Sequence, residues 1–567
     1  MKAAMIVILL NQLGFYPHSP KIAIVTGQPT AAVFYVVRIP VGDTVYSGAL
    51  GPAVTSSNSS LRTYEADFTG FEKEGDYRVV VPGAGDSYPF HIGGHMAAPV
   101  VKAALKGYYY QRSGVALDKR YASIWHRPPG HPDTSVLVHP SAASEGRPAG
   151  TVVSSPGGWY DAGDYNKYIV NSGITMGTLL SAYEDFSGLY DTLHTNIPPM
   201  KGVPDLLNEC LYNLRWMLTM QDLGDGGVYH KCTNAAFDSM VMPGVTKLPR
   251  YVVQKGTAAT LDFTAVMAQA GRIFRKFSRQ LPGLADSCLH AAQAAWRWAA
   301  LHPAVVYNQT AMNRNFSPAV TTGAYGDMDM RDEWYWAAAE LLVTTGIKEF
   351  RDTVQARMKD AYGLPAWANV HMLGDYTLLR HRDALPVGEE RSLREHLLGM
   401  ADNYLKLAQS NAFHTVMGTG ARDFIWGSNA VAANQGVLLI NAALLTKERK
   451  YVDGALGNLD YLLGRNATGY CFVTGMGSRS PMHPHHRPSV ADGIVPPVPG
   501  LLVGGPNPGR QDRQTYTMTE PETAYLDNDK AYASNEIAIN WNAPLVYLAG
   551  AIEALRAPEK SRPKDRH

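Results

Sequence analysis

Two patterns of hydrophobic residues divide the chain at about residue 93. Before that point, short runs rich in β-branched and aromatic residues alternate with turn-rich stretches. These runs cover residues 22–25, 32–37 and 77–81. Short strands at such spacing are typical of a small β-sandwich. The pair Gly93-Gly94 offers a boundary at which this unit ends.

From about residue 97 onward the hydrophobic period is helical. Between residues 204 and 221, apolar side chains recur at three- and four-residue steps and form one face. Pro204 suits the first turn of this helix. Comparable segments lie near 97–112, 168–188, 257–278, 284–301, 332–346, 349–362, 391–411, 428–446, 449–464 and 535–556, with room for one more near 368–380.

Long loops separate these helices, at 113–167, 222–256, 302–331 and 465–534. Loops of this length in a compact domain are usually functional. The pattern favours a ring of helical hairpins whose loops gather on one face. We therefore expect a β-sandwich over residues 1–95, a helical domain over 96–556 and a disordered tail over 557–567.

Composition narrows the class of protein. The chain has 567 residues with 46% hydrophobic and 18% charged residues, which excludes general disorder. A net charge of +1 argues against nucleic-acid binding and against a polybasic membrane surface. No apolar run reaches membrane-spanning length. The apolar run at residues 3–10 is interpreted as a first strand or as the remainder of a removed signal.

Cysteines and aromatic residues add two expectations. Cys210, Cys232, Cys288 and Cys471 lie far apart without paired spacing, so buried free thiols are favoured over disulfides. The chain has 31 Tyr and 10 Trp, whose flat faces and polar edges suit stacking on sugar rings. Half-buried packing in a large protein is the alternative explanation of these aromatics.

Two aspartates form the first chemical candidate. Asp161 and Asp164 lie three residues apart in a glycine-containing turn and can point to the same side. Carboxylates about 4 Å apart repel by roughly 4 kcal/mol at an effective dielectric of 20. One of them then protonates unless donors hold both ionised. A held pair could bind and deprotonate one water; the alternative is a helix N-cap followed by a first-turn anion.

Two further junctions carry candidate chemistry. His483, His485, His486 and Arg487 lie in a proline-rich loop, where metal binding, sugar binding and loop structure all stay open. Glu536 stands at the start of the last apolar helix. Apolar surroundings would raise its pKa and suit a general acid, whereas a capping role is the alternative.

Motifs along nearly the whole chain resemble glycoside hydrolase family 9, in the subgroup with an N-terminal immunoglobulin-like module. They occur in family order: NQLGFYP at 11–17 with Lys21, WYDAGDY at 159–165, PDLLNE at 204–209, WMLTMQ at 216–221, DEWYWAA at 332–338, WGSN at 426–429, YLLGRN at 461–466, PHHR at 484–487, GGPN at 504–507 and NE at 535–536. The resemblance implies a small all-β immunoglobulin-like sandwich followed by an all-α (α/α)6 barrel.

The resemblance also implies function and residue roles. It implies an inverting endo-β-1,4-glucanase, in which Asp164 is the general base, Asp161 helps to hold the water and Glu536 is the general acid. Acid and base would then lie roughly 6.5–9.5 Å apart. Sugar contacts are implied at His230, Trp426, His485, Arg487 and Tyr532. Tyr532 would lie beside Glu536, and packing in the core is the alternative for Trp426.

The implied substrate is amorphous or soluble cellulose or mixed-linkage glucan. An exo-acting enzyme that releases glucose or cellobiose is one alternative, and a non-catalytic glycan-binding protein is another. We expect a monomer that needs no cofactor for its chemistry and has no membrane or nucleic-acid partner. The polymeric substrate favours a secreted location.

Two metal sites follow from the resemblance. Members of the subgroup often hold a structural zinc with two Cys and two His, but this chain has Ser113, Gly130, His131 and Lys167 in that region. One histidine cannot hold zinc, so we expect zinc to be absent. A calcium site is implied at an acidic loop with the oxygen ligands that Ca²⁺ prefers: Asp327, Asp329, Asp332 and Glu333. A solvated helix N-terminus is the alternative.

Overall fold

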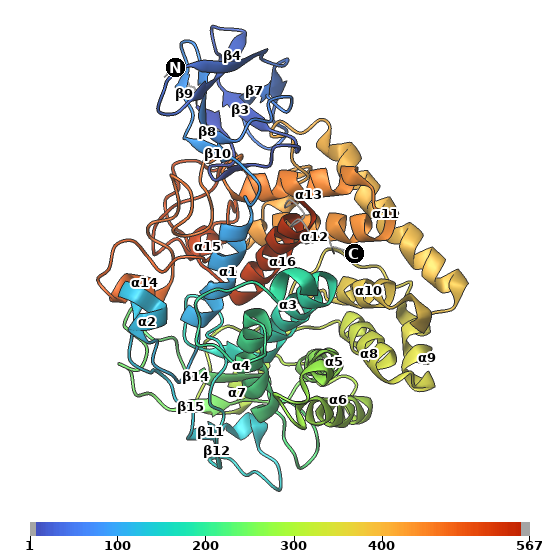
Figure 1. Ribbon diagram of the computed structural model, residues 1–567. Coiled ribbons are helices and arrows are strands. Elements are labelled where there is room, and N and C mark those ends of the chain that lie inside the picture. Colours follow the sequence, from blue (N-terminus) through green and yellow to red (C-terminus); the bar gives the residue numbers. More distant parts are fainter. Residues whose placement is uncertain (1–6, 557–567) are drawn as a thin grey trace.

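A β-module stands on a larger helical body in the computed structural model, which describes residues 7–556 (Figure 1). The proposed tail over 557–567 lies outside the described residues. One sheet of the module has the order β1-β3-β7-β6: Ile8–Leu9, Ile22–Thr26, Arg62–Asp67 and Val54–Thr55. The second has the order β2-β10-β8-β4-β5, with β9 beside β8: Gly14–Phe15, Phe90–Ile92, Gly75–Val81, Val33–Arg38, Thr44–Ala49 and Gly85–Asp86.

The core of this module is aromatic. Phe15 contacts Phe68 and Phe90 edge-to-face at 5.3 Å, a favoured arrangement for ring pairs. The three strands predicted from hydrophobic runs are present as β3, β4 and β8. β5 and β7 were not predicted, because their residues alternate with polar ones or leave one face partly exposed. The described part of the opening apolar run forms β1.

The helical body contains the predicted long helices. They are α1 (Ala98–Tyr110), α3 (Ile169–Tyr190), α4 (Asp205–Thr219), α5 (Thr257–Phe274), α6 (Leu284–Leu301), α8 (Arg331–Thr345), α9 (Lys348–Arg357), α10 (His371–Arg380), α11 (Val387–Ala408), α12 (Ser428–Thr446), α13 (Arg449–Leu462) and α16 (Ile539–Arg556). Short helices that the hydrophobic period did not predict are α2 (Lys119–Ala122), α7 (Gln309–Asn315), α14 (Arg487–Ala491) and α15 (Tyr532–Asn535).

Six helices are buried along most of their length: α3, α5, α8, α10, α12 and α16. They pack in the order α16-α3-α5-α8-α10, and α12 packs against α16. Each also packs against a more exposed helix, which lies outside it in Figure 1: α4 on α3, α6 on α5, α9 on α8, α11 on α10, α13 on α12 and α1 on α16. α12 has the length and hydropathy of a membrane span, but 78% of its most apolar window is buried inside the protein.

A five-stranded sheet occupies regions that were predicted to be loops. Its order is β12-β11-β15-β14-β13: Val152–Val153, Val136–Val138, Arg250–Val252, Lys231–Asn234 and Lys167–Tyr168. The loop prediction was wrong here, because each strand is only two to four residues long and gives no periodic signal. This sheet carries the segment that enters α3, and therefore sets the position of the Asp161–Asp164 turn.

The β-module contacts loops of the helical body through buried polar side chains. Gln12 donates from Nε2 to the Gly469 carbonyl at 2.9 Å and accepts from the amides of Ser478 and Arg479 at 2.9 and 2.8 Å. Gln12 is 6% exposed, so these contacts satisfy the polar atoms of its buried side chain. The module thereby holds the segment that leads toward residues 480–487.

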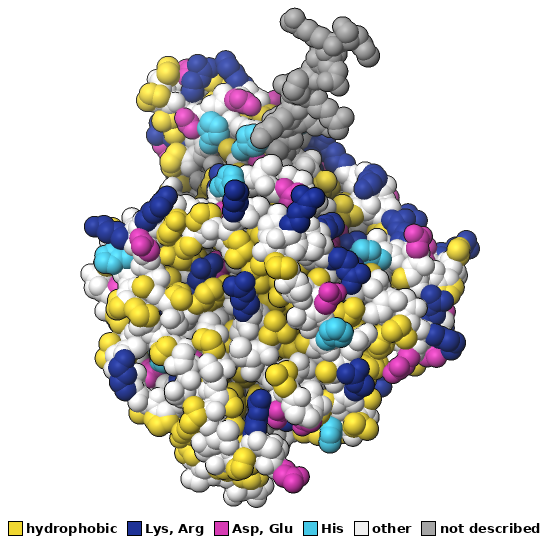
Figure 2. Space-filling view, turned by 60° about the horizontal axis from the view of Figure 1, so that its bottom comes forward, with side chains coloured by type: hydrophobic (Ala, Val, Ile, Leu, Met, Phe, Trp, Pro, Cys, Tyr) yellow, Lys and Arg dark blue, Asp and Glu magenta, His cyan; other side chains and the backbone are white. Residues whose placement is uncertain are grey.

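The distribution of surface charge and the state of the cysteines both agree with the expectations from the sequence. In Figure 2, Lys and Arg side chains are dispersed among acidic and neutral ones over the face shown, without a large area of one sign. All four cysteines are buried and free, which confirms the prediction of unpaired thiols.

Candidate active site

Asp161, Asp164 and Glu536 line one cavity of about 430 Å³. They come from segments far apart in the chain, one before α3 and one between α15 and α16. Aromatic side chains form much of the remaining wall: Tyr168, Phe237, Tyr325, Trp367, Trp426 and Trp541. The structure therefore brings the three predicted carboxylates together beside aromatic faces that suit sugar rings.

The Asp161–Asp164 turn is fixed by close backbone contacts. The Asp161 amide donates to the Asn166 carbonyl at 3.0 Å, and the Ile539 amide donates to the Asp161 carbonyl at 2.9 Å. A side chain at Gly163 would place its Cβ 2.1 Å from the His485 carbonyl oxygen, so only glycine fits there. These contacts bind the turn to the beginning of α16 and to the loop of His485.

Asp161 is buried and accepts a hydrogen bond on each oxygen. Asn171 donates from Nδ2 to Oδ1, and the Tyr325 hydroxyl donates to Oδ2, both at 2.7 Å. Burial and the neighbouring Asp164 carboxylate raise the pKa of Asp161 to about 8, while the two donors oppose the shift. A hydrogen bond to each oxygen therefore fixes the orientation of the Asp161 carboxyl group.

Asp164 has its donors on a single oxygen. The side-chain amide of Asn166 donates to Oδ2 at 2.5 Å, and the Tyr168 hydroxyl donates to the same atom at 3.2 Å. Asp164 also lines the cavity. This arrangement aligns the carboxylate by one oxygen and leaves Oδ1 without a donor among the described residues.

Glu536 lies in an extended break between two helices. α15 ends at Asn535 and α16 begins at Ile539, so Glu536 precedes the last helix instead of occupying its first turn. Burial, followed by Asp164 and Asp161, raises the pKa of Glu536 well above its usual value, while Arg487 opposes the shift. Burial thus raises the pKa of both Glu536 and Asp161, and a carboxyl group that holds its proton near neutral pH suits a general acid.

Three of the implied sugar contacts form a row of neighbouring rings that begins at Trp426 in the cavity wall. Trp426 is 41% exposed and its ring centroid lies 5.4 Å from that of Tyr532. Tyr532 lies 5.7 Å from the ring of His485, whose Nδ1 is 2.6 Å from the Asp529 carbonyl oxygen. The exposed face of Trp426 removes the core-packing alternative for that residue.

The two other implied sugar contacts lie behind the cavity wall. His230 is 1% exposed, stacks on Tyr307 at 3.9 Å and has Nε2 at 2.6 Å from the Ala324 carbonyl oxygen. Arg487 is 6% exposed and donates to the carbonyls of Gly163 and Asp238 at 2.8 and 2.9 Å. Both side chains are engaged in holding backbone, so in this structure they support the cavity from outside.

Sequence reasoning missed residues that complete the site. Asn171 and Tyr325 hold Asp161, and Tyr168 holds Asp164. Asn171 lies within an apolar helix and gives no local signal. Tyr325 lies within the acidic stretch that was considered only for calcium, and its contact depends on folding across more than 150 residues.

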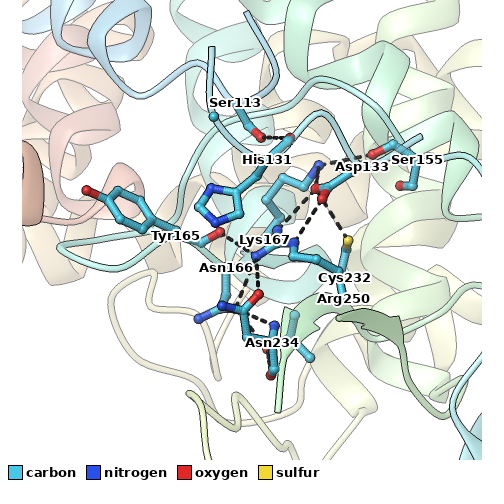
Figure 3. A network of polar contacts seen from close by, with 12 residues as sticks. Ser113, His131, Asp133, Ser155, Tyr165, Asn166, Lys167, Cys232, Asn234 and Arg250 are labelled. Atoms are coloured by element: carbon cyan, nitrogen blue, oxygen red, sulfur yellow. Dashed lines mark hydrogen bonds and ion pairs between the residues drawn. The ribbon is translucent and has the colours of Figure 1, made fainter. Parts of the chain in front are cut away.

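The region where members of the subgroup often hold zinc contains a charged network in this chain (Figure 3). Lys167 forms an ion pair with Asp133 at 2.8 Å and donates to the carbonyls of Ser155 and Gly157 at 3.1 and 2.7 Å. Arg250 pairs with the other oxygen of Asp133 at 2.9 Å. Burial raises the pKa of Asp133, but the two cations outweigh it and hold the pKa below its usual range.

This donor set does not fit a zinc ion. Ser113 donates to the His131 carbonyl at 3.1 Å, and Nδ1 of His131 is 3.0 Å from the Tyr160 hydroxyl. Gly130 supplies no side chain, and an ammonium group is not a metal ligand.

The acidic residues proposed for calcium divide into two groups. Asp327 and Glu333 are buried and have carboxylate oxygens without hydrogen-bond partners, and Asp262 of α5 has two more beside them. Asp329 is instead paired with Arg331 at 2.5 Å on the surface.

Asp332 lies at this cluster and accepts from the Val370 amide at 2.7 Å. Within residues 7–556, no group of three or more His, Cys, Asp or Glu is arranged to hold a metal ion. Calcium therefore stays a prediction, and Asp262 is a neighbour of the cluster that sequence reasoning missed.

Known proteins match along nearly the whole chain. The family profile described as "Glycosyl hydrolase family 9" matches residues 98–549, and that described as "Cellulase N-terminal ig-like domain" matches residues 4–86. The chain is 46% identical over 554 residues to the xyloglucan-specific endo-beta-1,4-glucanase BoGH9A of Bacteroides ovatus, covering 97% of this chain and 94% of that protein.

Two further matches agree. The chain is 35% identical over 554 residues to endoglucanase D of Acetivibrio thermocellus, covering 96% of this chain and 83% of that protein. The solved structure of Bacteroides ovatus GH9 matches with a TM-score of 0.92 and 44% identity, over 97% of this chain and 99% of that one. A β-module, a helical body and a carboxylate-lined cavity, taken with these matches, define a glycoside hydrolase. The chain belongs to glycosyl hydrolase family 9 and carries an immunoglobulin-like N-terminal domain.

Proposed function

We propose that the enzyme hydrolyses the β-1,4-linked backbone of a glucan at internal bonds and inverts the anomeric configuration. The observation that carries this proposal is the shared cavity of Asp161, Asp164 and Glu536. The names of the relatives support the substrate class, since both are endoglucanases.

Asp164 acts as the general base in this proposal. Its Oδ2 is held by Asn166 and Tyr168, so the remaining oxygen is free to take a proton from water. Asp161 helps to position the same water and is itself fixed by Asn171 and Tyr325. The water oxygen attacks the anomeric carbon while Asp164 accepts the proton that the water loses.

Glu536 acts as the general acid. Its raised pKa keeps it protonated, so it gives its proton to the departing O4 as the bond between C1 and O4 breaks. The proton gained by Asp164 then returns to solvent, and Glu536 is reprotonated. Two carboxyl groups with different surroundings thus perform opposite tasks at one pH.

The row of rings that begins at Trp426 binds sugar. Trp426 offers an exposed ring for stacking, and Tyr532 and His485 continue this surface toward Glu536. His230 and Arg487 act on substrate indirectly, by holding the walls that face it.

Within β-1,4-glucans, xyloglucan is the second candidate beside amorphous cellulose and mixed-linkage glucan. The similarity to a xyloglucan-specific relative favours it. Exo-acting hydrolysis and non-catalytic glycan binding are the remaining alternatives.

The overall organisation belongs to the same proposal. The six buried helices and their six outer partners form an (α/α)6 barrel, as their packing order supports. The β-sandwich covers residues 1–95 and the catalytic domain 96–556. The enzyme acts as a secreted monomer, without a cofactor in the chemical step, and calcium is structural.

The product profile tests the function. Carboxymethylcellulose, xyloglucan and cellohexaose are supplied separately, with viscosity measured on the polymers and the first anomer of the products followed by NMR. A rapid fall in viscosity with initial α-anomers is expected. Glucose or cellobiose alone would indicate the exo-acting alternative, initial β-anomers would contradict inversion, and binding without turnover would indicate a glycan-binding protein.

Asp164→Asn separates the classes further. The amide cannot take a proton from water, so turnover is lost while binding of the oligosaccharide persists. Isothermal titration with cellohexaose measures the binding. Turnover that survives this substitution would contradict the role of Asp164.

A further inference from the structure

Lys231 of β14 is a fully buried lysine whose hydrogen-bond partners are all neutral. Its ammonium group donates to Gln309 Oε1 at 2.7 Å, to Thr322 Oγ1 at 3.0 Å and to the Gly323 carbonyl at 2.6 Å. Lys167, by comparison, has the carboxylate of Asp133 at 2.8 Å. A buried charge without a contacting counter-ion is costly, so its surroundings need an explanation.

Two hydrogen-bond chains lead from Lys231 to Asp164. In the first, Gly323 accepts from Lys231 with its carbonyl, and its amide donates to the Tyr168 hydroxyl at 3.1 Å. Tyr168 in turn donates to Asp164 Oδ2 at 3.2 Å. The ammonium group of Lys231 and the carboxylate of Asp164 are therefore connected through the backbone of Gly323 and the hydroxyl of Tyr168.

The second chain runs through the sheet. Thr322, which accepts from Lys231, is 2.7 Å from Thr233 Oγ1. Thr233 donates to Asn166 Oδ1 at 3.0 Å, and the Asn166 amide donates to Asp164 Oδ2. Both chains end on the same oxygen of Asp164, so they fix one orientation of the carboxylate.

Aromatic rings enclose the ammonium group of Lys231. It lies 5.4 Å from the ring centroid of Tyr168 and 5.6 Å from that of Tyr307, within the range of cation–π attraction. Burial lowers the pKa of Lys231 to about 7, and the Asp164 charge opposes this. The lysine is therefore charged throughout the acidic range in which a carboxylate ionises.

We propose that Lys231 is a positioning residue, which keeps Asp164 ionised and aligned through its charge and these two hydrogen-bond chains. The proposal rests on the proposed role of Asp164 as general base. Lys231 itself is behind the cavity wall and touches neither substrate nor the reacting atoms.

Other charged and titratable groups also face Asp164. Asp161 lies on its own turn, Tyr168 follows in β13, His485 lies in the loop before α14, and Glu536 lies between α15 and α16. Asp161 and Glu536 can only add negative charge, and burial lowers the pKa of His485. Arg487 and Arg250 are further cations beside this turn: they donate to the Gly163 and Tyr165 carbonyls at 2.8 and 2.9 Å, and Arg250 also reaches Asn166 Oδ1 at 3.5 Å. Lys231 differs from both because one of its chains passes through the Tyr168 hydroxyl to the Asp164 carboxylate.

Lys231→Met and Lys231→Gln remove the charge, and the glutamine keeps hydrogen-bond donors. The charges of Lys231 and Asp164 attract each other, so removing the positive charge takes a stabilising interaction away from the Asp164 carboxylate. We expect the acidic limb of the kcat/KM profile to move upward by about one pH unit in both variants, which is about a tenfold loss below the limb. KM at the pH optimum should stay within about twofold, because substrate contacts are unchanged. Lys231→Arg keeps the charge, so its acidic limb should stay at the wild-type position.

Lys255→Met is the matched control. Lys255 is a cation of the same region but is paired with Asp222 and Asp225, both at 2.7 Å. An equal shift in that variant, or an unmoved limb in both neutral Lys231 variants, would overturn the proposal. Loss of folding in both neutral variants, seen by circular dichroism, would also overturn it by making Lys231 structural. Asp164→Asn is measured in parallel: if it stays active, the proposed function itself fails, whereas an inactive Asp164→Asn with an unmoved limb rejects only the role of Lys231.

Discussion

The buried ion pairs of Asp133 allow us to predict how much the free energy of unfolding falls when the charge of Asp133 is removed. Asp133 is 4% exposed and lies between two cations, with Lys167 at 2.8 Å and Arg250 at 2.9 Å. Asp133→Asn keeps the shape of the side chain and removes its charge. Both cations then remain buried without their carboxylate.

The expected cost follows from the burial of this network. Removing one partner of a buried ion pair costs about 3–5 kcal/mol, because the other charge is left uncompensated. Asparagine still offers an oxygen acceptor, and Lys167 keeps two carbonyl acceptors, so the lower end of this range applies. We expect a loss of about 3 kcal/mol in the free energy of unfolding of the helical body.

Urea unfolding followed by far-UV circular dichroism measures the loss, with Lys167→Met and the double variant completing a cycle. Because Asp133 and Lys167 touch, the double variant should cost less than the sum of the single variants by about 1–3 kcal/mol. Additive costs, or a change below about 1 kcal/mol in Asp133→Asn, would refute the argument that charge pairing stabilises this loop region.

The pH dependence has a definite sign. The native pKa of Asp133 is held below its unfolded value of about 3.9, so its ionisation stabilises the native state above that pH. This contribution is lost as the pH falls below about 4. Wild type should therefore lose stability on acidification more steeply than Asp133→Asn.

Three other predictions follow from single contacts. Glu536→Gln should lower kcat on cellohexaose by about 10²–10⁴-fold. The activity of the wild type should fall as the pH rises through the raised pKa of Glu536, and an alkaline limb that is unchanged in the variant would refute this role. Gln12→Ala leaves the buried Gly469 carbonyl without its side-chain donor and should cost about 1–3 kcal/mol in urea unfolding. A change under 0.5 kcal/mol, the scale of a neutral surface substitution, would contradict this. Added Ca²⁺ should raise the thermal unfolding midpoint of wild type but not of Glu333→Gln, and an equal rise in both would exclude Glu333 as a ligand.

Helices and strands differed in how well the sequence predicted them. α4 and α13 could be predicted, because a helix of about four turns repeats its apolar pattern several times. β13 and β14 could not, since two to four residues contain no period and their pairing depends on distant partners.

The site shows the same limit. The roles of Asp161, Asp164 and Glu536 were proposed from local motifs, and the structure places these residues around one cavity. The contact of Tyr325 with Asp161 and the chains from Lys231 cross between loops, where no motif spacing reports proximity. Local patterns identify residues with chemistry, whereas the groups that orient them are set by tertiary structure.

The two buried lysines of the β13–β14 region differ in what holds their charge. Lys167 has a carboxylate in contact, which offsets the cost of burial. Lys231 has only neutral contacts, and its native pKa of about 7 lies below the unfolded value of about 10.4. Between these values the unfolded chain binds more protons, so burying Lys231 lowers stability fully below pH 7 and progressively less as the pH rises. Stability therefore accounts for Lys167 but not for Lys231, which agrees with the positioning role that we propose for Lys231 behind Asp164.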